Sequence, residues 1–169
     1  MDNPAIAIRP AVPDDHDLVT AILAAAYPKL DDGSYDRGHL SEALPMMSKA
    51  NPRLLASGTY FIAMSYGEPA GCGGWTPEAP GTGTIEPGVG HIRHFATHPD
   101  HQRKGVAQAL LRRCLDEALA GGVKLMRSQS TLPAQKFYAS AGFSKVRDID
   151  VAMGPGVMLP AVEMELRLD

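Results

Sequence analysis

The sequence predicts a protein of the α/β or α+β class, with three layers built around one mixed β-sheet. Segments with strand and helix patterns alternate through the centre of the chain, and patterns typical of β-hairpins occur toward both ends. The 169 residues are enough for one domain with its own core, and no repeat, low-complexity tract or linker divides them. We therefore expect a single domain over residues 1–169.

The N-terminal part of the chain begins with a strand and a helix. Residues 5–9 alternate enough for a strand. Pro13 and the aspartates after it are typical of a helix start, and apolar residues follow at helical spacing. The stretch 28–57 is rich in acidic and turn residues, and a second helix is expected within it over 39–49.

The middle of the chain reads as a series of strands. Residues 59–66 and 70–76 flank a Gly-Glu-Pro turn and predict a β-hairpin, whose second strand is weak or bulged because of its glycines. The Pro/Gly-rich stretch 77–88 predicts a loop. A strand is expected over 89–97, and it ends before Pro99 because proline cannot donate to a strand ladder.

The C-terminal part alternates helices and strands. A helix over 105–120 carries an apolar stripe, and two glycines close it. The remaining expected elements are a strand over 123–128, a helix over 133–141, a strand over 143–148, a loop around Gly154-Pro155-Gly156 and a last strand over 161–168.

Composition excludes several classes of protein. The net charge of −3 gives no general affinity for nucleic acid, because binding to a phosphate backbone requires a strong basic excess. The two cysteines lack the spacing of a metal site, so we expect buried free thiols. The N-terminal segment does not resemble a signal peptide, and no stretch approaches the roughly 20 apolar residues that span a membrane. We expect a cytoplasmic protein without a nucleic-acid or membrane partner.

The segment between the strand over 89–97 and the following helix suits an anion. N–H groups at a helix start have no intrahelical partner, and the helix dipole adds positive potential. Gly105 and Ala107 are small enough for a phosphate to approach the backbone, while Arg103 and Lys104 add positive charge. A glycine that only begins a helix, beside charges exposed to solvent, gives the same pattern. The segment alone is therefore consistent with an anion site and with an ordinary helix start.

This segment resembles the signature of the GNAT superfamily of N-acetyltransferases. The run HIRHFATHPDHQRKGVAQALL, which starts at His91, contains a strand, a short turn and Gln/Arg-x-x-Gly-x-Gly/Ala opening a helix. Gln102, Gly105 and Ala107 occupy the fixed positions of that signature.

A second segment supports the same resemblance. Residues 130–143, STLPAQKFYASAGF, resemble the family's later strand–helix segment, which ends in Tyr, a few residues and Gly-Phe. Two motifs in the family order are far more specific than either one. The resemblance covers nearly the whole chain and is weakest at 28–57 and 77–88.

The resemblance implies a single-domain, mostly antiparallel mixed sheet that is splayed at its central strands, with helices on both faces. It implies that acyl-CoA lies between those strands, with its pantetheine arm on strand backbone and its pyrophosphate on the helix start. Thr97 replaces the branched aliphatic residue usual in the family, and Thr131 replaces an Asn that commonly bonds the cofactor arm. The implied acetyl-CoA-binding residues are Phe95, Ala96, Thr97, Gln102, Arg103, Lys104, Gly105, Val106, Ala107, Gln108 and Thr131.

Acetyl transfer to an amine needs an acid for the departing thiolate and a base for the amine proton. Tyr138 occupies the position where family members often place a tyrosine near the thioester sulfur, and a phenol with a pKa of about 10 stays protonated at neutral pH. Packing of its ring against the sheet is the alternative role.

His91 is the first candidate for the base, and Glu86 and a water relay are its alternatives. His91 occupies a position where several family members carry Glu or His, and imidazole is well matched to accept a proton at neutral pH. Strand alternation places His91 and His94 on opposite faces unless a bulge intervenes, so we expect no metal site. His98 and His101 are expected at the surface.

The acceptor is expected to be a small-molecule or peptide amine, and whether the protein forms a homodimer is left open. Four acidic residues lie in the region that forms the acceptor pocket in the family: Asp31, Asp32, Asp36 and Glu42. They would attract a cationic amine, or they are loop charges exposed to solvent. We thus expect an acetyl-CoA-dependent N-acetyltransferase. The alternatives are a non-catalytic acyl-CoA-binding regulatory module of the same fold and a nucleotide-binding domain.

Overall fold

The computed structural model describes residues 5–168 and contains one seven-stranded sheet with the strand order β1-β2-β3-β4-β5-β7-β6. Neighbouring strands are antiparallel except β4 and β5, which run parallel. The strands are β1 (Ile6–Pro10), β2 (Tyr60–Ser65), β3 (Glu68–Thr76), β4 (Val89–Thr97), β5 (Leu125–Ser130), β6 (Ser144–Gly154) and β7 (Val157–Arg167).

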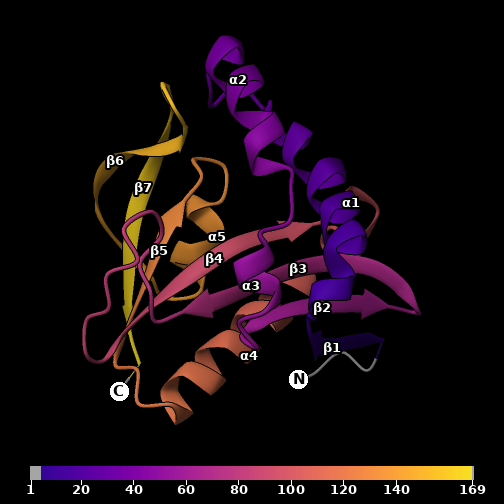
Figure 1. Cartoon of the computed structure of the whole chain (residues 1–169), viewed down its shortest axis with the longest axis vertical. Helices are drawn as coiled ribbons and strands as arrows, with labels where there is room; N and C mark the ends of the chain where they lie inside the picture. Colours follow the sequence, from indigo (N-terminus) through magenta and orange to yellow (C-terminus); the bar gives the residue numbers. More distant parts are fainter. Residues whose placement is uncertain (1–4, 169) are drawn as a thin grey trace.

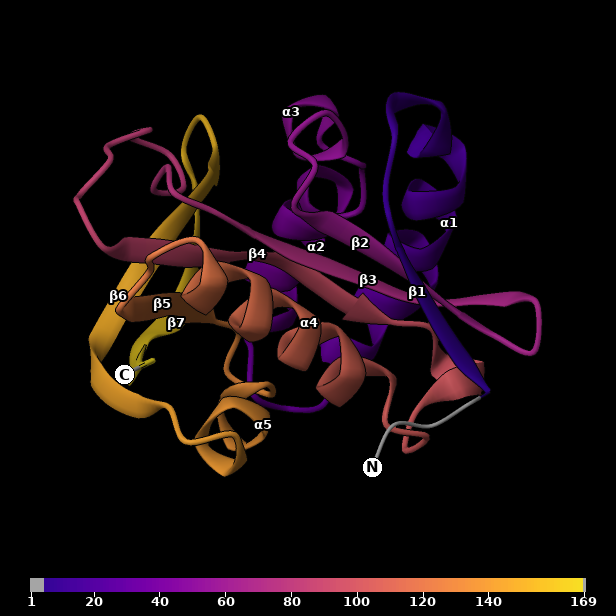
Figure 2. The ribbon, with the colours of Figure 1, turned by 90° about the horizontal axis from the view of Figure 1, so that it is seen from below.

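Helices cover both faces of this sheet. Figure 1 shows α1, α2 and α3 over one face, and the orthogonal view in Figure 2 places α4 and α5 on the other. The α-helices are α1 (His16–Ala26), α2 (Arg37–Met47), α3 (Pro52–Leu55), α4 (Val106–Ala120) and α5 (Gln135–Ser140). Short 3-10 helices are η1 (Pro13–Asp15), η2 (Tyr27–Leu30) and η3 (Pro99–His101). The predicted three-layer fold with helices on both faces is confirmed.

Two apolar cores fill the spaces between the layers. One lies under α1–α3 and includes Leu23 and Tyr60, while the other lies under α4 and includes Leu110 and Phe61. Because Tyr60 and Phe61 are neighbours on β2, this strand is buried on both faces. Both cysteines are buried and free, and burial raises the pKa of the Cys72 thiol to about 12.

The sheet opens between β4 and β5. The two strands pair at Val89↔Leu125, Gly90↔Met126 and His91↔Arg127, and the pairing stops there. Both strands continue beyond this point, β4 to Thr97 and β5 to Ser130. Their C-terminal halves therefore diverge, which is the splay that the sequence resemblance predicts.

A bulge in β4 changes which side chains face each core. Cys72 pairs with Ala96 but Gly74 pairs with Arg93, so Gly73 alone lies opposite two residues of β4. Ile92 and Ala96 would share a face in a regular strand, yet they pack in different cores.

This bulge corrects the expected separation of His91 and His94. Before the bulge, alternation puts His91 on the face opposite Ile92, which is the face of α1–α3. After the bulge, His94 contacts Tyr27 and Met47 on that same face. The two imidazoles therefore share a face of the sheet.

The C-terminal hairpin is longer than its sequence predicts. The loop expected around Gly154 is a tight turn, and β6 and β7 pair from Ser144↔Glu165 to Gly154↔Val157. Exposed polar side chains over much of β6 conceal the strand pattern. Gly154 also receives Met46 of α2, whose Sδ would lie 2.4 Å from a Cβ at this position, so the hairpin turn docks against α2.

Candidate active site

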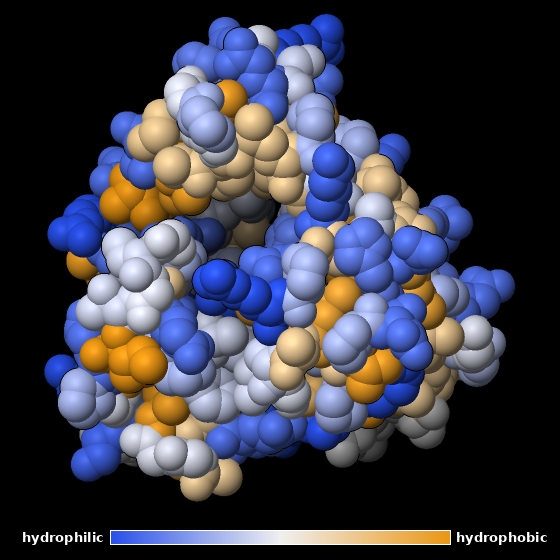
Figure 3. All heavy atoms as spheres, viewed as in Figure 1, coloured by the Kyte–Doolittle hydropathy of each residue, from blue (hydrophilic) through white to orange (hydrophobic). Residues whose placement is uncertain are grey.

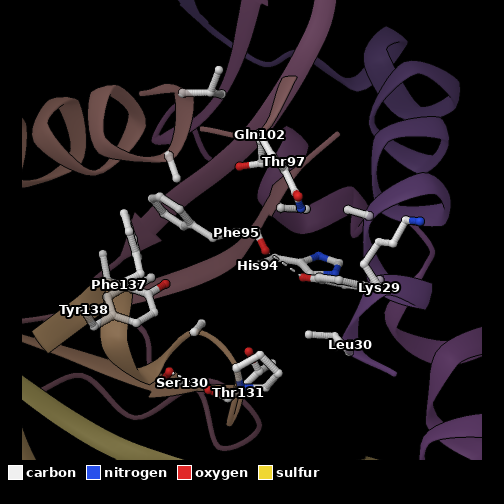
Figure 4. Close-up of a pocket in the computed structure, with 18 of the residues that line it drawn as sticks. Lys29, Leu30, His94, Phe95, Thr97, Gln102, Ser130, Thr131, Phe137 and Tyr138 are labelled. Atoms are coloured by element: carbon white, nitrogen blue, oxygen red, sulfur yellow. Dashed lines mark hydrogen bonds between the residues drawn. The ribbon is translucent and has the colours of Figure 1, made fainter. Parts of the chain in front are cut away.

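A cavity of about 610 Å³ occupies the opening between β4 and β5. Phe95, Ala96 and Thr97 line one side and Ser128 to Thr131 line the other, with the start of α4 and the end of α1 completing the walls. Figure 4 shows side chains from both diverging strands turned toward this space. The cavity therefore brings together the two sequence motifs, which lie on different strands.

The start of α4 forms one end of the cavity. Gly105 is the N-cap residue with φ +82°, no side chain caps the helix, and Arg103 also has a positive φ of 62°. The first amides of α4 thus lack intrahelical partners, next to the positive end of the helix dipole. Of the predicted pyrophosphate-binding residues, those that line the cavity are Gln102, Arg103, Gly105, Val106, Ala107 and Gln108. Lys104 does not belong to the lining.

Two tyrosines hold the bulge of β4 in place. The hydroxyl of Tyr27 donates to the carbonyl of Phe95 at 3.0 Å, and the hydroxyl of Tyr60 donates to the carbonyl of His94 at 2.7 Å. Burial raises the pKa of both phenols well above its usual value, so both stay protonated and able to donate. The sequence motifs do not point to either residue.

Replacing Tyr60 with Phe is expected to lower the free energy of unfolding by about 1–3 kcal/mol, because the His94 carbonyl loses its donor. Urea denaturation measures this change. The exposed Tyr66 provides the matched control, since Tyr66→Phe should change stability by less than about 0.5 kcal/mol. Equal stabilities of the two variants would show that the Tyr60 hydroxyl does not support the bulge.

Tyr138 lies in the wall of the cavity formed by α5. Its ring packs edge-on against Phe95, Phe137 and Phe143, and its side chain is 5% exposed. Burial raises the pKa of its phenol, and a hydrogen bond with Ser128 opposes that rise. Figure 4 shows the hydroxyl directed into the cavity, so Tyr138 combines ring packing with a proton available at the site.

The other predicted site residues lie in different surroundings. Thr131 lines the cavity, and its carbonyl accepts from the Ser130 hydroxyl at 2.8 Å. His91 is buried but is not among the lining residues. Burial lowers the pKa of His91, as do the charges of Arg127 and Arg93, and Glu86 opposes them.

Glu86 and Arg127 form an ion pair beside His91. The Glu86 carboxylate lies 3.2 Å from the Arg127 guanidinium, which also binds Glu165 at 3.0 Å. Using Glu86 as a base would therefore disturb an existing charge network. Its role in proton transfer stays a prediction.

Tyr35 fixes the loop that carries Thr131, and no sequence motif points to it. Its hydroxyl accepts from the amide of Leu132 at 2.8 Å and donates to the carbonyl of Pro160 at 2.9 Å. One phenol thus connects the α1–α2 segment, the β5–α5 loop and β7. Its partners are 97 and 125 residues away in sequence, so no local pattern could reveal the contact.

His101 and two of the acidic residues near α2 have polar partners within the protein. His101 was expected at the surface but is buried, with Nε2 3.3 Å from the Glu68 carboxylate, because η3 folds it beneath β3. The acidic residues near α2 have local partners: Asp36 caps α2, and Asp31 lies 3.4 Å from Arg37.

Within residues 5–168, no group of three or more His, Cys, Asp or Glu could hold a metal ion, and no helix is long and apolar enough to cross a membrane.

Three solved structures with the same fold carry the name of an acetyltransferase or were solved with coenzyme A or acetyl-CoA. A GCN5-related N-acetyltransferase from Rhodopseudomonas palustris aligns with a TM-score of 0.79 and 23% identity over 99% of both chains. The yncA protein of Salmonella typhimurium, solved with acetyl-CoA, has a TM-score of 0.64 and 24% identity over 98% of this chain and 95% of its own. The paia N-acetyltransferase of Thermoplasma acidophilum, solved with coenzyme A, has a TM-score of 0.68 and 14% identity over 96% and 98%.

These identities are low, so the structural likeness establishes the fold alone. No curated protein matches the sequence significantly. The model of the acetyltransferase (GNAT) family matches residues 20–143, which is more than half of the chain and includes both sequence motifs. The chain belongs to the GNAT family of acetyltransferases.

Proposed function

We propose that the protein is an acetyl-CoA-dependent N-acetyltransferase that moves an acetyl group to a primary amine by direct attack in a ternary complex. The observation that carries the proposal is the cavity between β4 and β5, which has an uncapped helix start at one end and the Tyr138 hydroxyl in its wall. Acetyl-CoA has the matching parts: a diphosphate, an amide-bearing arm and a thioester.

The walls of the cavity fit the donor. The amides from Gln102 to Gln108 would bind the pyrophosphate, since a helix start favours anions. Beyond His91, β4 and β5 no longer pair with each other, so backbone groups that face the gap are not engaged by the other strand and would bind the amides of the pantetheine arm. Ser130 and Thr131 lie along the β5 side of the same path.

Tyr138 would protonate the thiolate that leaves from acetyl-CoA. Its raised pKa keeps the phenol protonated at neutral pH, and its hydroxyl faces the cavity. A base must also take a proton from the attacking amine. His91, Glu86 and a water relay are the bases proposed from the sequence, and neither His91 nor Glu86 lines the cavity.

Release of free thiol from acetyl-CoA, measured over a library of small amines and peptides, tests the proposal. We expect at least one amine to raise the rate above the hydrolysis seen without an acceptor, with the acetylated amine detected by mass spectrometry. Binding of acetyl-CoA without transfer to any amine would instead support the non-catalytic acyl-CoA-binding module. Stabilisation by ATP or NAD but not by coenzyme A would support a nucleotide-binding domain.

A further inference from the structure

His94 has an unusual backbone conformation at the centre of the site. Its φ is +55°, and it is one of the two β4 residues that lie opposite Gly73. A residue with a side chain is uncommon in this region of φ/ψ space, and such strain persists only where the surroundings enforce it. Here the Tyr60 hydroxyl holds the His94 carbonyl, and the Tyr27 hydroxyl holds the next carbonyl along the strand.

The bulge sends two neighbouring side chains to opposite faces of the sheet. The Phe95 ring lies 6.5 Å from the ring of Tyr138, on the side of α4 and α5. The His94 ring lies 5.6 Å from the ring of Tyr27, on the side of α1–α3. Both residues still line the cavity, so His94 and the proposed acid Tyr138 approach it from opposite sides.

The hydrogen bonding of His94 fixes which nitrogen can accept a proton. Its Nε2 lies 2.8 Å from the carbonyl oxygen of Met47, and because a carbonyl only accepts, Nε2 carries the hydrogen. The lone pair of the neutral ring is then on Nδ1, and the side chain has no other hydrogen bond within residues 5–168. Burial lowers the pKa of His94, the Met47 carbonyl opposes this, and the charge of Arg93 lowers it further, so the ring stays neutral at neutral pH.

The molecular surface is hollowed on the side of the sheet away from α4 and α5. Figure 3 shows the face that carries α1 and α2, and this face is deeply hollowed at its centre, below α2. Figure 4 shows the His94 ring between β4 and the segment of Lys29 and Leu30, across the cavity from the Tyr138 hydroxyl. His91 lies on the same face but does not line the cavity.

We propose that His94 is the general base of the transfer, with Nδ1 taking a proton from the acceptor amine. This role rests on the proposed function. As the neutral amine attacks the thioester carbonyl, the C–N bond forms, and one N–H proton passes to Nδ1. The C–S bond then breaks, and the Tyr138 hydroxyl gives its proton to the sulfur. Transfer of the imidazolium proton to the phenolate through water restores both groups, so the products are the acetamide and free thiol.

The test compares His94→Asn with His91→Asn and with His39→Asn. Asparagine tolerates positive φ and places an amide where Nδ1 lies in histidine, but it has no basic nitrogen and is too short to reach the Met47 carbonyl. With the best acceptor from the amine library, kcat of His94→Asn should fall about 10²-fold or more. The affinity for acetyl-CoA should stay within about threefold. His39 is exposed on α2, so His39→Asn should behave like the wild type.

The kcat values of the histidine variants distinguish His94 from His91 as the general base. A larger loss of kcat in His91→Asn than in His94→Asn would overturn the role of His94, as would full turnover of a folded His94→Asn protein. Recovery of turnover by added imidazole in His94→Asn would support it, because a merely structural defect does not respond to a small base. If the wild type transfers acetyl to no amine, the proposed function fails and the base fails with it.

A second measurement keeps the proposal testable if His94→Asn does not fold. Nitrogen NMR of the wild-type ring reports which nitrogen carries hydrogen. The proposal requires protonated Nε2 and unprotonated Nδ1 at neutral pH. A hydrogen on Nδ1 would overturn it.

Discussion

Replacing Gly105 with Glu is expected to abolish binding of acetyl-CoA. The variant puts a carboxylate beside the first amides of α4, where the pyrophosphate would lie, and a Cβ at this position meets no atom closer than 3.9 Å, so the side chain has room. Two unit charges 4 Å apart repel by about 4 kcal/mol near a protein surface, which is about 10³-fold in affinity. Isothermal titration of the variant with acetyl-CoA measures the loss.

Two further variants separate charge from strain. Gly105 has φ +82°, so any side chain there costs about 1–2 kcal/mol of conformational energy. Gly105→Gln carries the same strain without the charge and should bind acetyl-CoA more tightly than Gly105→Glu. Gly122→Glu adds the same residue to a positive-φ glycine (φ +93°) beyond the other end of α4, with open space around it. It should bind like the wild type. If Gly105→Glu bound acetyl-CoA as tightly as the wild type, the pyrophosphate would not bind at this loop.

Replacing Tyr138 with Phe should reduce kcat about 10²-fold, because the leaving thiolate loses its proton donor. The ring contacts with Phe95, Phe137 and Phe143 survive in this variant, so the affinity for acetyl-CoA should change less than about threefold. Steady-state kinetics with an active amine, together with titration calorimetry for acetyl-CoA, measure both quantities.

The leaving group distinguishes acid catalysis by Tyr138 from a packing role. A thioester of a more acidic thiol departs without a proton, so the defect of Tyr138→Phe should shrink with such a donor. An equal defect for both donors would show that the hydroxyl acts by packing or by its bond with Ser128. Unaltered turnover with acetyl-CoA would remove Tyr138 as the acid.

The parts of the site that the sequence predicts are those encoded by short motifs. Six residues of the segment from Gln102 to Gln108 line the cavity, as do Phe95, Ala96, Thr97 and Thr131. A helix start and the end of a strand are local features, because neighbouring residues and backbone geometry determine them. The same holds for Tyr138, whose helix lies within the second motif.

The supports of the site lie beyond the reach of local patterns. Tyr27 reaches Phe95 across 68 residues, and Tyr60 reaches His94 across 34. Such contacts depend on how helices and strands pack, and a tyrosine that supports a carbonyl has the same sequence context as one in a core. The β4 bulge is hidden for another reason, because an alternating sequence pattern does not show where an extra residue interrupts the alternation. The strand register and the switch of cores between Ile92 and Ala96 reveal the bulge in the structure.

The short pairing of β4 with β5 also bears on how the sheet responds to a ligand. Among residues 5–168, only three residue pairs of β4 and β5 join the four strands β1–β4 to the three strands β5, β7 and β6, so the sheet consists of two half-sheets with a narrow seam. A ligand that hydrogen-bonds to both diverging strands would act as a crosslink across that seam. Amide hydrogen exchange should then slow in both half-sheets when acetyl-CoA binds, including at strands that the ligand never contacts.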